Sequence, residues 1–176
     1  MVGFVTFFIA LVVSLGSEAL MKIVNNFILA FLMLFLIIGL GIFFDLIGTA
    51  ATAAELPPFN ARAAKKVYGA AQAVRLLKNA SKVANYCNDV IGDICGTVSG
   101  AIGAGIVFSL VDTFSIGNIV LVSAVMTSFI AATTVGGKAI GKSVALTRAN
   151  QIIFQVALVI AWWENLTGIK LFDNRR

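Results

Sequence analysis

Long stretches without a charged residue alternate with short polar stretches along the chain. Residues 27–44 form one such stretch of eighteen residues, which as a helix would measure about 27 Å, close to the hydrocarbon thickness of a bilayer. Asp45 interrupts this stretch and uncharged residues continue over 46–54. Pro57 and Pro58 then end the predicted helix, because proline cannot donate a backbone hydrogen bond inside a helix. The pattern predicts an all-α integral membrane protein, a single domain over 1–176 with about four transmembrane helices. The predicted spans are 1–17, 27–54, 88–111 and 116–137.

Two further segments, 60–85 and 138–163, are too polar or too short to span a bilayer. Six Lys/Arg and no acid lie between Arg62 and Lys82, and apolar residues recur there every three or four positions. This predicts an amphipathic juxtamembrane helix, or two helices joined at Gly69, lying on the membrane surface. The alternative is a solvated face that packs on its own protein. In the second segment, Trp162 and Trp163 favour a re-entrant or interfacial helix.

Composition supports the membrane prediction and orients the chain. Hydrophobic residues make up 60% of the sequence and charged residues 12%, whereas a soluble domain carries roughly twice that charge. The basic balance of +5 is concentrated in 61–82 and 138–148, which hold nine Lys/Arg, while the opposite connections hold only Lys22. The positive-inside rule therefore predicts a multi-pass protein of the cell membrane, with both termini and the basic loops cytoplasmic. Nucleic acid is not expected as a partner, since these bases do not lie on a soluble fold.

The start of the chain allows a second interpretation. Residues 2–15 are apolar and are followed by small residues, as in a secretory signal peptide. The first three residues carry no positive charge, however, and signal peptides have a basic segment before the apolar one. We therefore expect a retained helix.

Acidic residues gather where the second and third spans are expected to meet the cytoplasm. Asp89, Asp93 and Thr97 follow one another at helical spacing, and Asp45 and Thr52 share a face of the preceding span. The chain has no histidine, so a metal site would be built from oxygen or sulfur, and the carboxylate and hydroxyl oxygens of these two helices suit a hard cation such as Mg²⁺. The alternative is that Asp89 and Asp93 offset a helix dipole and that Asp45 pairs with a lysine.

Enzymatic activity is not expected. The absence of histidine excludes Ser/His and Cys/His pairs. Residues 136–143 match the phosphate-loop pattern G-x-x-x-x-G-K-[ST], but that loop functions between a strand and a helix, and none of the expected elements is a strand. An intramembrane aspartyl protease would need Asp45 to face Asp89 or Asp93, and nothing else in the sequence supports this activity.

Four short motifs, spread over residues 27–163, resemble in order those of the CNNM/CorC magnesium transporters. Thr-Ala-Ala-Glu at 52–55 stands for the family's Ser-x-x-Glu, and 69–77 resembles its Ala- and Leu-rich juxtamembrane helix. Ile-Gly-Asp at 91–93, followed by Thr97, takes the place of Ile-Gly-Asn-x-x-x-Asn. The last motif, Gly-Glu-x-x-Pro-Lys-x-x-Ala, corresponds to 137–145.

The resemblance implies a homodimer that binds and exports Mg²⁺. It implies Thr52, Asp93 and Thr97 as direct ligands of the ion. The expected supporting residues are Asp45, Glu55, Asp89, Gly136 and Gly137.

The chain also departs from the family. Lys138 and Gly141 replace the family's Glu and Pro, the span at 1–17 is additional, and the cytosolic CBS pair is missing, so a separate cytosolic subunit could supply regulation. The rival hypothesis is a membrane interaction module that transports nothing and uses its basic helix to recruit a cytosolic partner or anionic lipid.

Overall fold

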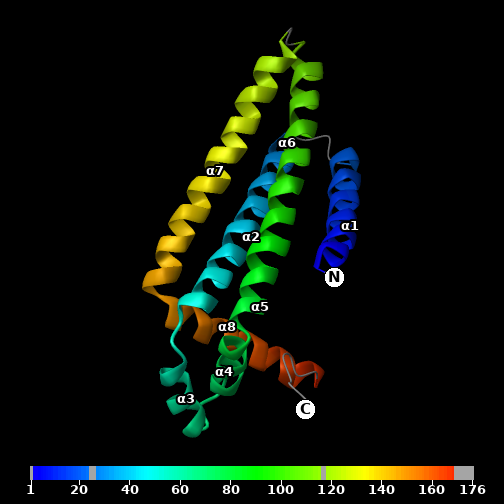
Figure 1. Cartoon of the computed structure of the whole chain (residues 1–176). Coiled ribbons are helices and arrows are strands. Elements are labelled where there is room, and N and C mark those ends of the chain that lie inside the picture. The colour runs from blue at the N-terminus through cyan, green and yellow to red at the C-terminus, as the bar shows by residue number, and fades with distance from the viewer. Residues whose placement is uncertain (1, 24–26, 116–117, 169–176) are drawn as a thin grey trace. The chain divides into compact units, whose positions relative to one another are not determined.

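The computed structural model describes residues 2–23, 27–115 and 118–168, and all regular structure in these ranges is helical (Figure 1). The all-α prediction is therefore confirmed for this part of the chain. The helices follow in the order α1 (Val2–Ile23), α2 (Phe27–Ala53), α3 (Leu56–Ala64), α4 (Ala70–Lys78), α5 (Ala80–Ala84), the π-helix η1 (Asn85–Gly92), α6 (Asp93–Phe114), α7 (Ile119–Thr147) and α8 (Ala149–Thr167).

Three candidate membrane spans are long and apolar enough to cross a bilayer: Ile28–Ala53, Ala80–Phe114 and Ile119–Thr147. The second comprises α5, η1 and α6. Large apolar side chains such as Phe43, Phe108 and Val120 are exposed on them, as expected of surfaces that face lipid. The described apolar part of α1, Thr6–Gly16, is shorter than these spans. Residues 116 and 117, where the predicted fourth span begins, lie outside the described residues.

Two compact units make up the chain. Unit 1 comprises Met1–Phe43 and Val90–Ala139, and unit 2 comprises Phe44–Asp89 and Ile140–Arg176. In unit 1, α2, α6 and α7 share a core that includes Leu34, Ile102 and Ile130, and α1 packs against α6. Gly103 lies so close to Ile130 that an added Cβ would overlap it. A glycine on α6 thus sets how closely α7 can approach, as is common for helices in membranes.

Unit 2 contains the short helices α3, α4 and α5, the ends of α2 and α7, and α8. Its core includes Phe59, Leu76 and Ile153, and α4 packs against both α3 and α8. Gly69 separates α3 from α4 with a φ of 81°, a left-handed conformation that favours glycine, so the basic segment forms separate helices before and after this residue. Continuing beyond residue 137, where the predicted span ends, α7 reaches Thr147 because Ala145 is fully buried in this core.

Candidate functional site

Asp45 is the most deeply buried acidic residue among those the structure describes. It lies on the part of α2 that belongs to unit 2 and is 4% exposed. Its Oδ2 atom is buried and accepts no hydrogen bond. The Lys142 ammonium, from the end of α7 in the same unit, lies 4.0 Å from Oδ2, which is beyond hydrogen-bonding distance. The carboxylate therefore has a counter-charge but an unfilled acceptor position.

A second unpaired oxygen comes from η1. Asn88 Oδ1 is buried and has no hydrogen-bond partner in the described part of the chain. The Asn88 amide lies directly over Gly48, where an added Cβ would overlap Oδ1 and Cγ. Gly48 follows Asp45 by three residues, so both occupy one face of α2. Asp45, Gly48 and Asn88 all belong to unit 2.

The local structure explains why Asn88 reaches α2. The absence of a side chain at Gly48 leaves room for the amide, and the π-helical turn of η1 carries Asn88 there. Single π-helical turns within longer helices occur frequently at functional sites. Sequence reasoning missed Asn88. The available signal was an uncharged polar residue at the start of the predicted span 88–111, one position before Asp89.

The chemistry of these atoms suits a hard cation. A buried oxygen without a partner costs about 1–3 kcal/mol, and more if it is charged, so such atoms call for an explanation. A carboxylate oxygen and an amide carbonyl oxygen are both ligands of Mg²⁺ and Ca²⁺. The described residues contain no group of three or more Asp, Glu or Cys side chains that could hold a metal. A cation site here would thus need amide, hydroxyl, backbone or water oxygens beside the carboxylate.

The three ligands predicted from sequence lie in more open positions. Thr52, in unit 2, is exposed, and its hydroxyl donates to the Thr49 carbonyl at 2.9 Å. In unit 1, the Thr97 hydroxyl donates to the Asp93 carbonyl at 3.0 Å. The Asp93 carboxylate is 73% exposed and lies 4.0 Å from the Lys138 ammonium. Both hydroxyl groups keep lone pairs available, but neither is buried.

The predicted supporting residues, like the predicted ligands, are distributed over both units. Glu55 and Asp89 are exposed in unit 2, and the backbone N–H of Glu55 donates to Asn150 Oδ1 at 2.9 Å. In unit 1, Gly136 has open space around it, whereas an added Cβ at Gly137 would overlap Ile42. Asp45 is thus the one predicted site residue whose side chain the structure buries.

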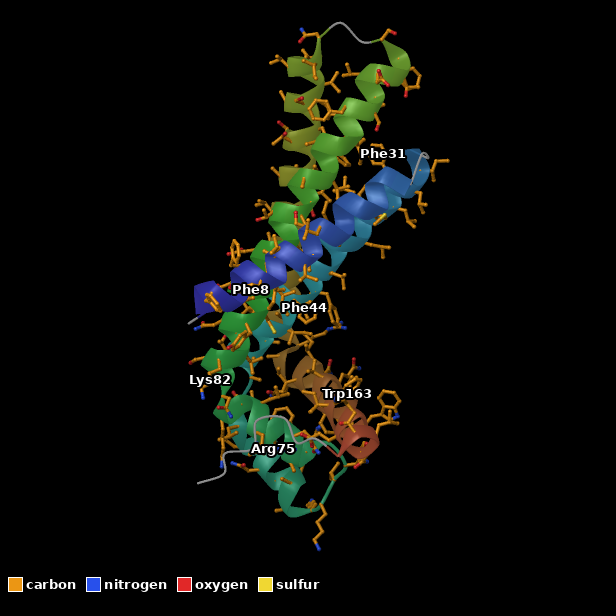
Figure 2. All side chains as sticks on the ribbon, turned by 90° about the vertical axis from the view of Figure 1, so that its right-hand side faces the viewer. Phe8, Phe31, Phe44, Arg75, Lys82 and Trp163 are labelled. Atoms are coloured by element: carbon orange, nitrogen blue, oxygen red, sulfur yellow. The ribbon has the colours of Figure 1, made fainter. Side chains whose placement is uncertain are left out.

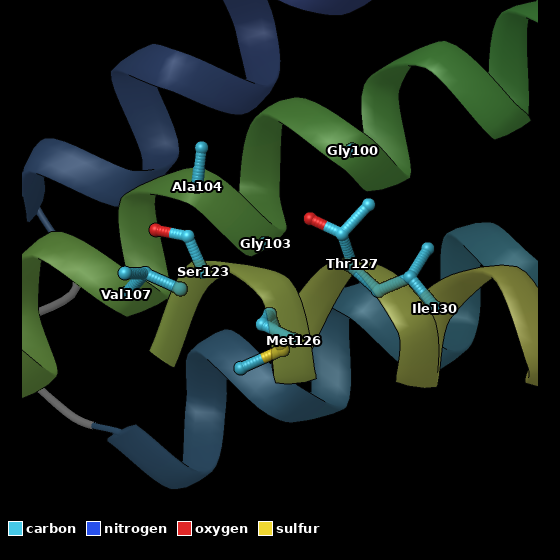
Figure 3. A pocket seen from close by; sticks show the side chains of 8 residues that line it. All are labelled: Gly100, Gly103, Ala104, Val107, Ser123, Met126, Thr127 and Ile130. Carbon is cyan, nitrogen blue, oxygen red and sulfur yellow. The ribbon is translucent and has the colours of Figure 1, made fainter. Parts of the chain in front are cut away.

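A small cavity of about 100 Å³ lies between α6 and α7 in unit 1 (Figure 3). Ser123 and Thr127 on α7 contribute hydroxyl groups to it, beside Gly100 and Gly103 of α6. The remaining walls are mostly apolar. With no carboxylate in its lining, this cavity offers a weaker site for a divalent cation than Asp45 does.

A partly buried ion pair joins α4 to α8 within unit 2. Arg75 Nη2 lies 2.6 Å from Glu164 Oε2, and Gln72 Nε2 donates to the same oxygen at 3.0 Å. The Glu164 side chain is only 8% exposed. Figure 2 labels Arg75 on α4 and Trp163 on α8. This cluster fixes α8 against the basic helices and leaves Trp162 and Trp163 exposed.

Comparisons of the chain with models of protein families, with curated proteins and with solved structures found no match. The resemblance to the CNNM/CorC family therefore stays a prediction from short motifs. What the protein does has to be inferred from its apolar helices and from the chemistry around Asp45.

Proposed function

We propose that this protein binds Mg²⁺ within the membrane and transports it, as the resemblance to the CNNM/CorC family implies. The observation that carries the proposal is the buried Asp45 carboxylate, whose Oδ2 accepts no hydrogen bond. Ionisable residues within transmembrane segments are rare because they are costly to bury, and they usually serve an ion or proton pathway. Asp45 follows the apolar stretch 27–44 on one of the candidate spans.

The ligand set favours Mg²⁺ over softer metals. Asp45 would contribute the negative charge and Asn88 a neutral carbonyl oxygen, and neither histidine nor a cysteine group competes for the ion. Mg²⁺ usually keeps several water molecules and is bound by one or two carboxylates, so a site with few protein ligands is sufficient. Thr52, on the same helix as Asp45, is an additional proposed ligand.

The wider proposal follows the sequence prediction. Asp93 and Thr97 are proposed ligands from α6, with Glu55 and Asp89 as exposed acids that attract cations to the cytoplasmic side. The protein is proposed to be a homodimer of the cell membrane with four spans and its basic helices in the cytoplasm. A separate cytosolic subunit is the proposed source of regulation.

Two measurements on the same preparation test this function. Isothermal calorimetry on detergent-solubilised protein measures Mg²⁺ binding, and a fluorescent indicator inside liposomes measures Mg²⁺ flux. We expect Asp45→Asn to lose binding and flux, since it removes the negative charge of the buried carboxylate, while Asp112→Asn serves as a control near the other end of a span. Mg²⁺ binding by Asp45→Asn with wild-type affinity would contradict the proposal.

A second function has one observation in its favour. Lys65, Lys66, Lys78 and Lys82 are all exposed on or between the helices of unit 2, as a surface for anionic lipid or an acidic partner requires. If well-folded protein gives no Mg²⁺ flux but binds vesicles containing phosphatidylserine more tightly than neutral vesicles, the interaction module is the better hypothesis.

A further inference from the structure

Lys142 forms an ion pair with Asp45 without a hydrogen bond between them. Its ammonium nitrogen lies 4.0 Å from Oδ2, close enough for charge attraction but too far for a hydrogen bond. The Lys142 side chain is 54% exposed, whereas the Asp45 side chain is almost fully buried. The positive charge therefore lies at the edge of the site, between the protein surface and the carboxylate.

We propose that Lys142 is a tethered cation, which neutralises Asp45 when the site is empty and is displaced into water by the bound divalent ion. This inference rests on the proposed function of Asp45. A lysine ammonium is a compact charge on a flexible four-carbon stem, so it can move away without any change in the helix that carries it. Once the metal neutralises the carboxylate, the repulsion between the two cations drives Lys142 outward.

The neighbouring ion pair provides a contrast. Lys138 precedes Lys142 by one helical turn on α7, and its ammonium also lies 4.0 Å from a carboxylate, that of Asp93 in unit 1. That carboxylate is 73% exposed, so protein does not enclose it whether or not Lys138 is present. The two lysine–carboxylate distances are equal, but the burial of the carboxylates differs. The buried Asp45 carboxylate therefore needs a nearby cation to balance its charge more than the exposed Asp93 carboxylate does.

The test compares Lys142→Gln with the matched control Lys138→Gln. The midpoint of thermal unfolding and the Kd for Mg²⁺ are measured in detergent, with and without MgCl₂. For Lys142→Gln we expect a lower midpoint without Mg²⁺ and a Kd about tenfold smaller than in the wild type, because the competing charge is gone. Lys138→Gln should leave the midpoint near its wild-type value and lower the Kd much less than Lys142→Gln does, because the Asp93 carboxylate beside Lys138 is exposed. An unchanged or larger Kd in Lys142→Gln would overturn the proposal.

Additional outcomes keep this inference separate from the proposed function. If the wild-type protein shows no Mg²⁺ effect at all, the function itself fails. If Mg²⁺ binds the wild type and Lys142→Gln equally well, only the role of Lys142 fails.

Folding defects are also informative. A Lys142→Gln protein that folds only in MgCl₂ supports the proposal, because the metal replaces the missing charge. One that fails to fold even in MgCl₂ counts against it, and so does misfolding of the doubly neutral variant Asp45→Asn/Lys142→Gln.

As a direct readout, labelling of the Lys142 amine by an amine-reactive reagent should increase on adding Mg²⁺.

Discussion

Arg75 and Glu164 form the shortest ion pair between two helices in the described part of unit 2, with Nη2 and Oε2 separated by 2.6 Å. They lie 89 residues apart in sequence and join α4 to α8. Because Glu164 is buried, its charge depends on Arg75 and Gln72 for compensation. The position of α8, with its two exposed tryptophans, follows from this contact.

Replacing Arg75 by methionine should destabilise unit 2. The substitution leaves Glu164 charged and buried without its guanidinium partner, and breaking a buried pair on one side costs about 3 kcal/mol. We expect a lower unfolding midpoint, measured by circular dichroism in detergent. The double variant Arg75→Met/Glu164→Leu should recover much of the loss, because apolar residues of similar size can replace a buried pair. A single variant as stable as the wild type would show that the pair is dispensable.

Gly48→Ala should weaken Mg²⁺ binding without unfolding the protein. The new methyl group would overlap the Asn88 amide and displace its oxygen. Shifting a group that orients a metal site typically costs about 10–100-fold in affinity. Calorimetry measures the Kd, and Gly39→Ala is the control, since Gly39 lies on the same helix with open space around it. Equal affinities in the two variants would argue against Asn88 as a ligand.

Gly103→Ala should destabilise the packing of α6 against α7 in unit 1. The added Cβ would overlap Ile130, and overpacking of this kind costs about 1–3 kcal/mol. Gly100→Ala, one turn earlier on the same helix, meets nothing within 4 Å and should be neutral. Unfolding midpoints in detergent compare the two. If the two variants unfold at the same temperature, Gly103 does not limit the approach of the helices.

Trp162 and Trp163 should lie at the level of the lipid headgroups. Both are exposed on α8, and they are the only tryptophans in the chain, so wild-type fluorescence reports on this helix alone. Aromatic residues of this type concentrate at the membrane–water interface. We expect stronger quenching by lipids brominated near the headgroup than by lipids brominated near the chain end. Quenching by an aqueous quencher alone would place α8 in the cytosol instead.

Much of the helical structure was predictable from the sequence. The predicted span 27–54 corresponds to α2 at Phe27–Ala53, because a long apolar stretch permits few other structures in a membrane. The possible division of the basic segment at Gly69 was also visible, since glycine readily adopts a positive φ. The extent of α7 was not. Its last turns carry polar residues and depend on Ala145, whose burial requires partners distant in sequence.

The candidate site was only partly predictable. Asp45 and Asp93 are both single acids beside apolar stretches, and helical spacing gives no indication that one is buried and the other exposed. The difference arises from what packs against each residue, which the local sequence does not specify. The role of Asn88 depended on Gly48, forty residues earlier, and on a π-helical turn that periodic patterns do not reveal.

The π-helix η1 limits where this chain can tolerate the insertion or deletion of a residue. Each residue added to an α-helix turns the residues on one side of it by about 100° about the helix axis, relative to those on the other side. Deleting one residue from 85–92 would restore the regular pitch, but it would turn Asn88 away from α2 even if every other amino acid were kept. We therefore expect chains with this architecture to tolerate substitutions in this segment more readily than single-residue insertions or deletions.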